Sequence, residues 1–410
     1  MNHSQSLPEP SPDALQHSQK LIARIREEID NNIDKNNNAS ISFRRYMEMA
    51  LYEPTLGYYV AGTHKIGEKG DFVTAPEISP LFSQCIANQC AEVLHEINTS
   101  PSSTISTTVN ASILELGAGS GIMAVNILFA LEKQDRLPNV YYILDLSPDL
   151  KQRQKENIEK HIPHLLDRVE WLAQLPDSFD GIILGNEVLD AMPVDVFTQQ
   201  GDRVFEHHVI WENDQLVEQL KPASDNLSTT VVNLNIPNEA TPYTSEINPN
   251  LAGWFKSLSQ SLHSGVILLI DYGYTRSEYY LPERNKGTLI CHYQQLVNEA
   301  PLHYAGLQDI TANVDFTAVA EAADDAEFTV AGFTSQAAFL ANSGLEACFL
   351  QALNIDSDDQ PQEQQYKLAQ QVRVLSLPSE MGERFKFIGL TKNYNKKLSG
   401  FSNMNQLHRL

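Results

Sequence analysis

The stretch Ile113-Leu-Glu-Leu-Gly-Ala-Gly-Ser-Gly121 decides the fold class of this chain. Its apolar beginning predicts a buried strand, and its three glycines predict a tight turn after that strand. The next run, Ile122–Leu131, carries apolar residues at helical spacing. Glycines are needed in such a turn when a ligand approaches the backbone more closely than a Cβ atom allows. The sequence therefore predicts a strand, a ligand-binding turn and a helix.

The spacing of the glycines argues against a dinucleotide as this ligand. A dinucleotide-binding turn would have its third glycine at the position of Ile122. Here the glycines are Gly117, Gly119 and Gly121, and Glu115 places a carboxylate just before them, where it can face a cation. S-adenosylmethionine (SAM) carries an ammonium and a sulfonium group but no pyrophosphate. The acidic turn therefore favours SAM as the cofactor.

A second acidic residue follows the next predicted strand. That strand, Val140–Leu144, ends in Asp145, about where a carboxylate binds ribose hydroxyls in doubly wound nucleoside sites. The alternative is that Asp145 only caps the helix predicted to begin at Ser147. We expect the ribose-binding role, with the helix cap kept as the alternative.

The pattern of predicted elements indicates an α/β protein with a doubly wound, Rossmann-like sheet. From residue 112 to about 197, strands alternate with helices, which is typical of a parallel sheet. Before this region, 14–29 and 43–51 have helical periodicity, and the alternation ends at about 195. The expected parts are a disordered tail (1–12), a helical extension with a cofactor-covering loop (13–96), the sheet core (97–194 and 263–395), an inserted substrate or partner region (195–262) and a C-terminal tail (396–410).

Some finer features are also predicted. Gln200-Gly-Asp202 has the composition of a hairpin turn between two strands. The stretch 222–246 is polar and resembles neither a repeat nor a core segment, and Pro101–Val109 should be an exposed connection. Apolar residues predict a strand at Gly265–Gly273, and the last two strands are expected at 328–331 and 385–391.

Three polar side chains follow the predicted strand Gly181–Leu184. They are Asn186, Glu187 and Asp190, and ligands of open α/β sheets bind beyond the carboxyl ends of the strands. Glu187 and Asp190 are three residues apart, so one turn of helix would place both carboxylates on one side. Paired carboxylates without a metal suit a cationic group. The alternative is a helix start, where acids are favoured by the helix dipole.

Composition excludes several classes of protein. The chain has 410 residues, a hydrophobic fraction of 42% and a net charge of −23, which argues against non-specific binding to nucleic acid. Membrane-spanning runs are not expected. Four dispersed cysteines and an N-terminus without a signal or transit pattern predict reduced thiols in a cytoplasmic protein. The histidines show no metal-ligand spacing, and His207 and His208 are adjacent in a predicted strand, so no metal is expected.

Several motifs together resemble the MidA family of class I SAM-dependent methyltransferases. In family order, they extend from about residue 42 to 392. They are Ala50–Tyr59, Gly70–Ser79, Glu115–Gly119, Asn186–Ala191, Ile270–Gly273, Gly287–Leu289, Val314–Thr317 and Met381–Lys386.

The resemblance implies a class I methyltransferase fold, SAM as cofactor and a protein-arginine substrate. Mitochondrial members of the family methylate an arginine on a subunit of respiratory complex I, so the resemblance suggests such a subunit as the partner. It adds Thr74, Pro76, Glu77 and Ser79 to the expected cofactor-binding residues, beside the glycines, Glu115, Asp145 and Asn186.

The expected chemistry is an in-line methyl transfer at the sulfonium, which requires a nucleophile held close and collinear. An arginine arrives as a guanidinium cation. Glu187 and Asp190, with Asn186, could orient it through charge-assisted hydrogen bonds. Two alternatives stay open: a methyltransferase of a small molecule, and an assembly chaperone that binds SAM without catalysis.

Overall fold

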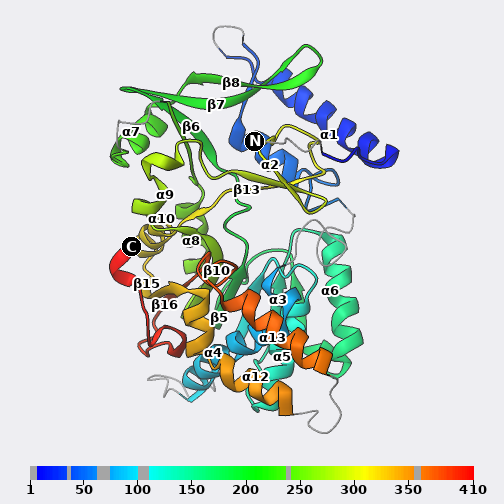
Figure 1. The fold of residues 1–410 in the computed structure, drawn as a ribbon, viewed down its shortest axis with the longest axis vertical. Coiled ribbons are helices and arrows are strands. Elements are labelled where there is room, and N and C mark those ends of the chain that lie inside the picture. Colours follow the sequence, from blue (N-terminus) through cyan, green and yellow to red (C-terminus); the bar gives the residue numbers. More distant parts are fainter. Residues whose placement is uncertain (1–6, 35–37, 62–73, 100–109, 237–241, 355–361) are drawn as a thin grey trace. The chain divides into compact units, whose positions relative to one another are not determined.

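The computed structural model describes residues 7–34, 38–61, 74–99, 110–236, 242–354 and 362–410. The chain divides into two compact units (Figure 1). The first unit comprises the described parts of 1–72, 190–250 and 276–313, and the second those of 73–189, 251–275 and 314–410. The predicted connection Pro101–Val109 and the first residues of the predicted tail, 1–6, lie outside the described residues.

The second unit is built on a largely parallel sheet. In spatial order its strands are β4 (Val169–Leu172), β3 (Tyr141–Leu144), β2 (Ser112–Leu116), β5 (Phe179–Asn186), β10 (Leu262–Tyr274), β16 (Phe385–Lys392) and β15 (Thr329–Ser335), with β14 (Val314–Asp315) beside β10. The pairs from β4 to β10 are parallel, and β16 is antiparallel to both of its neighbours. This confirms the predicted doubly wound sheet.

The order of these strands reverses between β2 and β5. From β2 the chain adds β3 and β4 on one side, and it then returns to pair β5 with the other side of β2. Ligands of open α/β sheets bind beyond the carboxyl ends of the strands at such a switch point. The three predicted constellations follow β2, β3 and β5, so the topology brings them to one edge of the sheet.

Helices in the second unit bury the sheet. Leu81, Phe82 and Ile86 of the first long helix pack in one core cluster with Ile113 and Leu184 of the strands. The predicted helix after the glycines is confirmed as α5. Helical bounds in this unit are α3 (Ala75–Ile78), α4 (Pro80–Thr99), α5 (Ile122–Lys133), α6 (Pro148–His161), η1 (Pro163–Arg168), α8 (Leu251–Ser261), α10 (Phe316–Asp325), α11 (Gln336–Asn342), α12 (Leu345–Asn354), α13 (Gln362–Ser376), η3 (Ser399–Phe401) and η4 (Leu407–Arg409).

The first unit combines two small sheets with one long helix, α1, and several shorter ones. The predicted hairpin is confirmed, because Gln200 pairs with Arg203 and Gly201 has a left-handed φ of 60°. The elements are α1 (Pro12–Asn31), β1 (Ile41–Ser42), α2 (Phe43–Tyr52), β6 (Asp195–Gln200), β7 (Arg203–Glu212), β8 (Gln215–Pro222), α7 (Asp225–Asn233), β9 (Tyr243–Ile247), α9 (Arg276–Tyr279), η2 (Pro282–Arg284), β11 (Ile290–Tyr293), β12 (Leu296–Asn298) and β13 (Asp309–Thr311).

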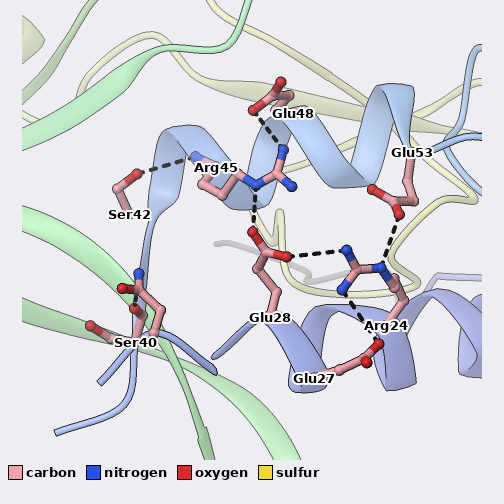
Figure 2. A network of polar contacts seen from close by, with 9 residues as sticks. Arg24, Glu27, Glu28, Ser40, Ser42, Arg45, Glu48 and Glu53 are labelled. Atoms are coloured by element: carbon pink, nitrogen blue, oxygen red, sulfur yellow. Dashed lines mark hydrogen bonds and ion pairs between the residues drawn. The ribbon is translucent and has the colours of Figure 1, made fainter. Parts of the chain in front are cut away.

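A network of ion pairs links α1 to α2 and to Glu53, which follows α2 (Figure 2). The Glu28 carboxylate accepts from Arg45 Nε at 3.1 Å and from an Arg24 guanidinium nitrogen at 3.2 Å. The hydrogen bond from Arg45 lowers the pKa of Glu28. Arg24 Nε also donates to Glu53 at 3.1 Å. Because these side chains are partly exposed, the network adds only modestly to stability.

The polar stretch 222–246 contains a core residue that the sequence interpretation did not foresee. Glu246 at the end of β9 is only 2% exposed. Its carboxylate accepts from the Thr288 amide at 3.0 Å, the Leu289 amide at 3.3 Å and the Tyr279 hydroxyl at 3.1 Å. Gly287 has a φ of +81°, and a Cβ there would come within 2.1 Å of Glu246 Oε1. The motif Gly287–Leu289 therefore binds the buried carboxylate of Glu246 through its backbone amides.

The two units differ from the predicted parts in four places. Helix α4 belongs to the second unit, because its apolar face packs in the core of that unit. Helix α8 also belongs there, because it packs against α10 and β10. Residues 276–313 belong to the first unit, where the Tyr46 hydroxyl donates to Pro301 O at 2.7 Å. The expected C-terminal tail packs in the second unit, with Phe401 4% exposed and its ring centroid 5.3 Å from that of Phe339.

Candidate functional site

The glycine turn has the backbone conformation that its glycines permit. Gly117, Gly119 and Gly121 have φ angles of 63°, 54° and 82°, all in the left-handed region that favours glycine. Among the described residues, a Cβ at Gly117 would meet only Val188, at 3.6 Å. At Gly121, which is the N-cap of α5, a Cβ would lie 2.9 Å from Gln154 Cα. The first glycine therefore leaves space for a ligand, and the third is required by the packing of α6.

Glu115 lies beneath this turn as a buried carboxyl group. It is 1% exposed on β2, and its Oε2 accepts a hydrogen bond of 2.7 Å from the Tyr141 hydroxyl. Burial, with a smaller contribution from the charge of Asp145, raises the pKa of Glu115 to about 7. A cation at the turn would favour the ionised form of this group.

Asp145 follows β3 and is held from two directions. Its Oδ1 accepts from the Ser147 amide at 3.0 Å, and its Oδ2 accepts from Gln154 Nε2 at 2.8 Å. Burial raises the pKa of Asp145. The side chain that caps α6 is Ser147, which accepts from the Leu150 amide at 3.3 Å. The capping function proposed as the alternative for Asp145 thus belongs to Ser147, and the ribose contact stays a prediction.

The motif Thr74–Ser79 contains the short helix α3 and ends directly before α4. Glu77 accepts a hydrogen bond from Ser120 Oγ, so this motif and the glycine turn are in contact. Ser79 is 1% exposed and accepts from the Leu81 amide at 3.3 Å, which is a capping contact to α4. Thr74 precedes α3, and Pro76 is buried within it. The rest of the expected covering loop, Gly70–Val73, lies outside the described residues.

Asn186 and Glu187 stand at the end of β5. Asn186 Nδ2 donates to Glu187 Oε1 at 3.0 Å, and the Glu187 amide donates to Ile270 O at 2.8 Å. Glu187 has a φ of 53°, a left-handed conformation that is uncommon outside glycine and worth attention at a candidate site. Within the described residues, Asn186 Oδ1 is buried and accepts no hydrogen bond.

The predicted helical turn from Glu187 to Asp190 is wrong. Residues 187–190 form bends and the start of a turn, since the left-handed φ of Glu187 is incompatible with a right-handed helix. The argument that a helix places both carboxylates on one side therefore fails.

Asp190 belongs to the first unit. It is 5% exposed, and its carbonyl accepts from the Ala312 amide at 3.0 Å. Burial, together with the nearby carboxylates of Asp309 and Asp190, raises the pKa of Tyr59, whose hydroxyl donates to Asp309 at 2.8 Å. Asp190 is thus a buried acid in an aromatic and acidic environment.

Three side chains that support the site were not identified from the sequence. Asp271 on β10 is fully buried and accepts from the Leu189 amide at 2.9 Å, so it holds the loop after β5. Asn157 and Gln154 on α6 donate to the carbonyls of Ser120 and Gly119 at 2.8 and 3.1 Å. The sequence offered two signals for these side chains. One is the pair of amides at i and i+3 on α6, and the other is the acid near the end of the predicted apolar strand Gly265–Gly273.

Two further features concern only the part of the chain that the structure describes. Among those residues, no group of three or more His, Cys, Asp or Glu side chains is placed to hold a metal ion. His207 is instead bonded to Glu218 and, at 2.7 Å, to Thr198. Within the described ranges, no helix is both long and apolar enough to cross a bilayer.

The residues at the switch point fit SAM. The buried Asn186 Oδ1 offers an acceptor to an ammonium group, Gly117 leaves the backbone approachable, and Asp145 offers a carboxylate to ribose hydroxyls. Leu146, next to Asp145, is 68% exposed, so it offers an apolar surface to a base. These groups supply the donors and acceptors that a cationic nucleoside requires.

Comparison with known proteins agrees with this geometry. Residues 85–334 match a family model described as "Putative S-adenosyl-L-methionine-dependent methyltransferase". The mitochondrial protein arginine methyltransferase NDUFAF7 of Homo sapiens is 29% identical over 380 residues, which cover 85% of this chain and 80% of that protein. Its homologue in Caenorhabditis elegans is 27% identical over 400 residues, which cover 92% of this chain and 86% of that protein.

A solved structure extends the similarity to the whole chain. A protein from Burkholderia thailandensis, crystallised with S-adenosyl-homocysteine, is 36% identical and superposes with a TM-score of 0.88. The comparison covers 99% of this chain and all of that one. A second crystal structure of a protein from the same organism is 35% identical, with a TM-score of 0.85. The chain therefore belongs to the MidA family and is a SAM-dependent methyltransferase.

Proposed function

We propose that this enzyme transfers the methyl group of SAM to an arginine side chain of a partner protein. The observation that carries the proposal is the Glu187 carboxylate at the switch point, held by the Asn186 amide in a left-handed turn. A carboxylate in that place complements a guanidinium, and the relatives NDUFAF7 of Homo sapiens and its Caenorhabditis elegans homologue are named protein arginine methyltransferases.

The chain's own residues would position the two reactants. The glycine turn, Asp145 and Asn186 would bind SAM, which supplies an electrophilic methyl group when bound. Glu187 would accept hydrogen bonds from the guanidinium and draw its positive charge away from the attacking nitrogen. Guanidinium has a pKa above about 12, so it stays protonated in water. The contribution of a carboxylate before transfer is therefore to orient the guanidinium, not to deprotonate it.

We also propose a catalytic role for the Asp190 carboxylate, argued from its surroundings in the first unit alone. It is buried in the first unit near the Tyr59 ring, and aromatic faces and carboxylates both attract guanidinium groups. This role for Asp190 depends on its own environment and not on the disproved helical turn.

The test is a single-turnover transfer from labelled SAM into lysate proteins, followed by mass spectrometry of the labelled protein. Label on arginine is expected. Label in a small molecule would instead identify a small-molecule methyltransferase, and SAM binding without transfer to any acceptor would identify a binding chaperone. Purified respiratory complex I subunits are the first substrates to test, since the family's mitochondrial members suggest them.

The Glu187→Gln variant tests the catalytic residue. It should retain SAM affinity and lose transfer by one to several orders of magnitude, because electrostatic contributions are large in a water-excluded site. Glu170→Gln, at an exposed position of β4, is the matched control and should transfer normally. Normal transfer by Glu187→Gln would leave Glu187 with a structural role only. The expected cytoplasmic location stays a prediction, which cell fractionation tests.

A further inference from the structure

Gln154 connects the two cofactor-binding segments of the second unit. It lies on α6 and is fully buried. Its Nε2 donates to Asp145 Oδ2 at 2.8 Å and to Gly119 O at 3.1 Å. One amide group therefore joins the acid after β3 to the glycine turn after β2.

The orientation of this amide is determined by its third partner. Gln154 Oε1 accepts from Trp171 Nε1 at 3.0 Å. An indole nitrogen can only donate, and a carboxylate or carbonyl oxygen can only accept. The oxygen of the amide must therefore face Trp171, and its nitrogen must face Asp145 and Gly119. All the polar atoms of the buried side chain are used, as is expected for a group that would otherwise be costly to bury.

The backbone around Gln154 also shapes the turn. A Cβ at Gly121 would lie 2.9 Å from Gln154 Cα, so α6 is packed directly against the third glycine. One helical turn later, Asn157 donates to Ser120 O at 2.8 Å. The carbonyls of Gly119 and Ser120 are thus both turned toward α6.

We propose that Gln154 is a positioning residue for SAM: its amide holds the glycine turn and the Asp145 carboxylate in fixed register, so that the two segments bind the amino-acid and ribose ends of the cofactor together. This inference rests on the proposed cofactor contacts of Asp145 and the turn. Each carboxylate oxygen can accept more than one hydrogen bond, so Asp145 can bind Gln154 and a ribose hydroxyl at once.

The experiment measures the affinity of S-adenosyl-homocysteine by calorimetry in Gln154→Met. This variant keeps the length of the side chain and removes both hydrogen bonds to the cofactor-binding segments. Affinity should fall roughly ten- to a hundredfold, the scale for a hydrogen bond to a charged group. The matched control is Gln152→Met on the same helix, where the exposed side chain donates to Glu156. The affinity of this control should be unchanged.

Two further readouts separate positioning from general stability. In the double variant with Asp145→Ala, removal of Gln154 should cost less affinity than it does in the wild type. Both changes disrupt the bond between Gln154 and Asp145, whereas the bond to Gly119 is lost only with Gln154. Acidification should also weaken binding earlier in the variant: the affinity of Gln154→Met should begin to fall at a higher pH than that of the wild type. The reason is that Gln154 opposes the effect of burial on the pKa of Asp145, and a protonated Asp145 accepts ribose hydroxyls less well.

Three results would overturn the proposal. The first is normal affinity in Gln154→Met, and the second is a loss that adds fully to that of Asp145→Ala without any change in the pH profile. Normal affinity in Asp145→Ala would overturn the ribose assignment on which the proposal rests, and the single variants thus distinguish the two failures. If Gln154→Met does not fold, Trp171→Phe removes the donor that orients the amide, and a loss of roughly three- to tenfold is expected; unchanged affinity there would contradict the proposal.

Discussion

Replacing Glu115 with glutamine should change how the stability of the protein depends on pH. The wild-type carboxyl group is buried and has a pKa raised from its ordinary value of 4.5 to about 7. Glutamine keeps the size of the side chain and an oxygen that can accept from the Tyr141 hydroxyl. It removes the charge that the folded protein must bury above pH 7.

The sign follows from the raised pKa. Because folded Glu115 binds its proton more tightly than unfolded Glu115, its contribution to stability is fully present below about pH 4.5. That contribution is lost as the pH rises to about 7, where the folded group ionises. At about 1.4 kcal/mol for each pH unit between the two values, the loss is on the order of 3 kcal/mol.

Urea unfolding of the ligand-free wild type and Glu115→Gln between pH 5 and 8.5 measures this effect. The free energy of unfolding of the variant, minus that of the wild type, should increase with pH and reach a plateau above pH 7. Glu170→Gln on β4 controls for the removal of a negative charge at an exposed position. A difference that is constant with pH would refute the argument. Saturating SAM should move the increase to lower pH if its cation lies near Glu115.

Three further changes test the site and the fold. Gly119→Val should abolish SAM binding in a folded protein, because the turn needs a left-handed φ and an approachable backbone; calorimetry with unchanged affinity would contradict the assignment. Asp145→Ala should weaken SAM binding by roughly 1–3 kcal/mol, also measured by calorimetry, and an unaltered Kd would exclude the ribose contact. Gly287→Ala should lower the thermal unfolding temperature more than Gly201→Ala does, since both have left-handed φ angles but only the former places a Cβ against Glu246; equal losses would disprove the clash.

Local sequence patterns were sufficient to predict much of the fold and the identity of the cofactor. The backbone at Gly117, Gly119 and Gly121 is left-handed, a conformation that favours glycine. The apolar runs on either side of these glycines form β2 and α5, as predicted. Asp145 and Asn186 could be placed at the same sheet edge because parallel strands bring their carboxyl ends together. These features depend on neighbours in the sequence and on a topology that alternating strands and helices largely determine.

The interactions that hold the site were decided by long-range packing. In the sequence, Gln154 is one of several amides in a polar segment. Its burial against Gly121 and its bond to Trp171 depend on where α6 and β4 pack. Likewise, Glu246 is in a polar segment, and its partners come from residues 279–289.

The left-handed Glu187 was the clearest failure of sequence reasoning. Spacing of Glu187 and Asp190 alone predicted a helical turn, whereas the Glu187 amide bonds Ile270 O on the neighbouring strand. The Leu189 amide is likewise held by Asp271 on that strand. A residue's own sequence neighbours determine which local conformations are open to it, and hydrogen bonds from distant strands determine which one is adopted. By itself the sequence therefore determined the cofactor turn and the sheet, and only the tertiary structure decided how the loop after β5 is folded and which buried side chains support it.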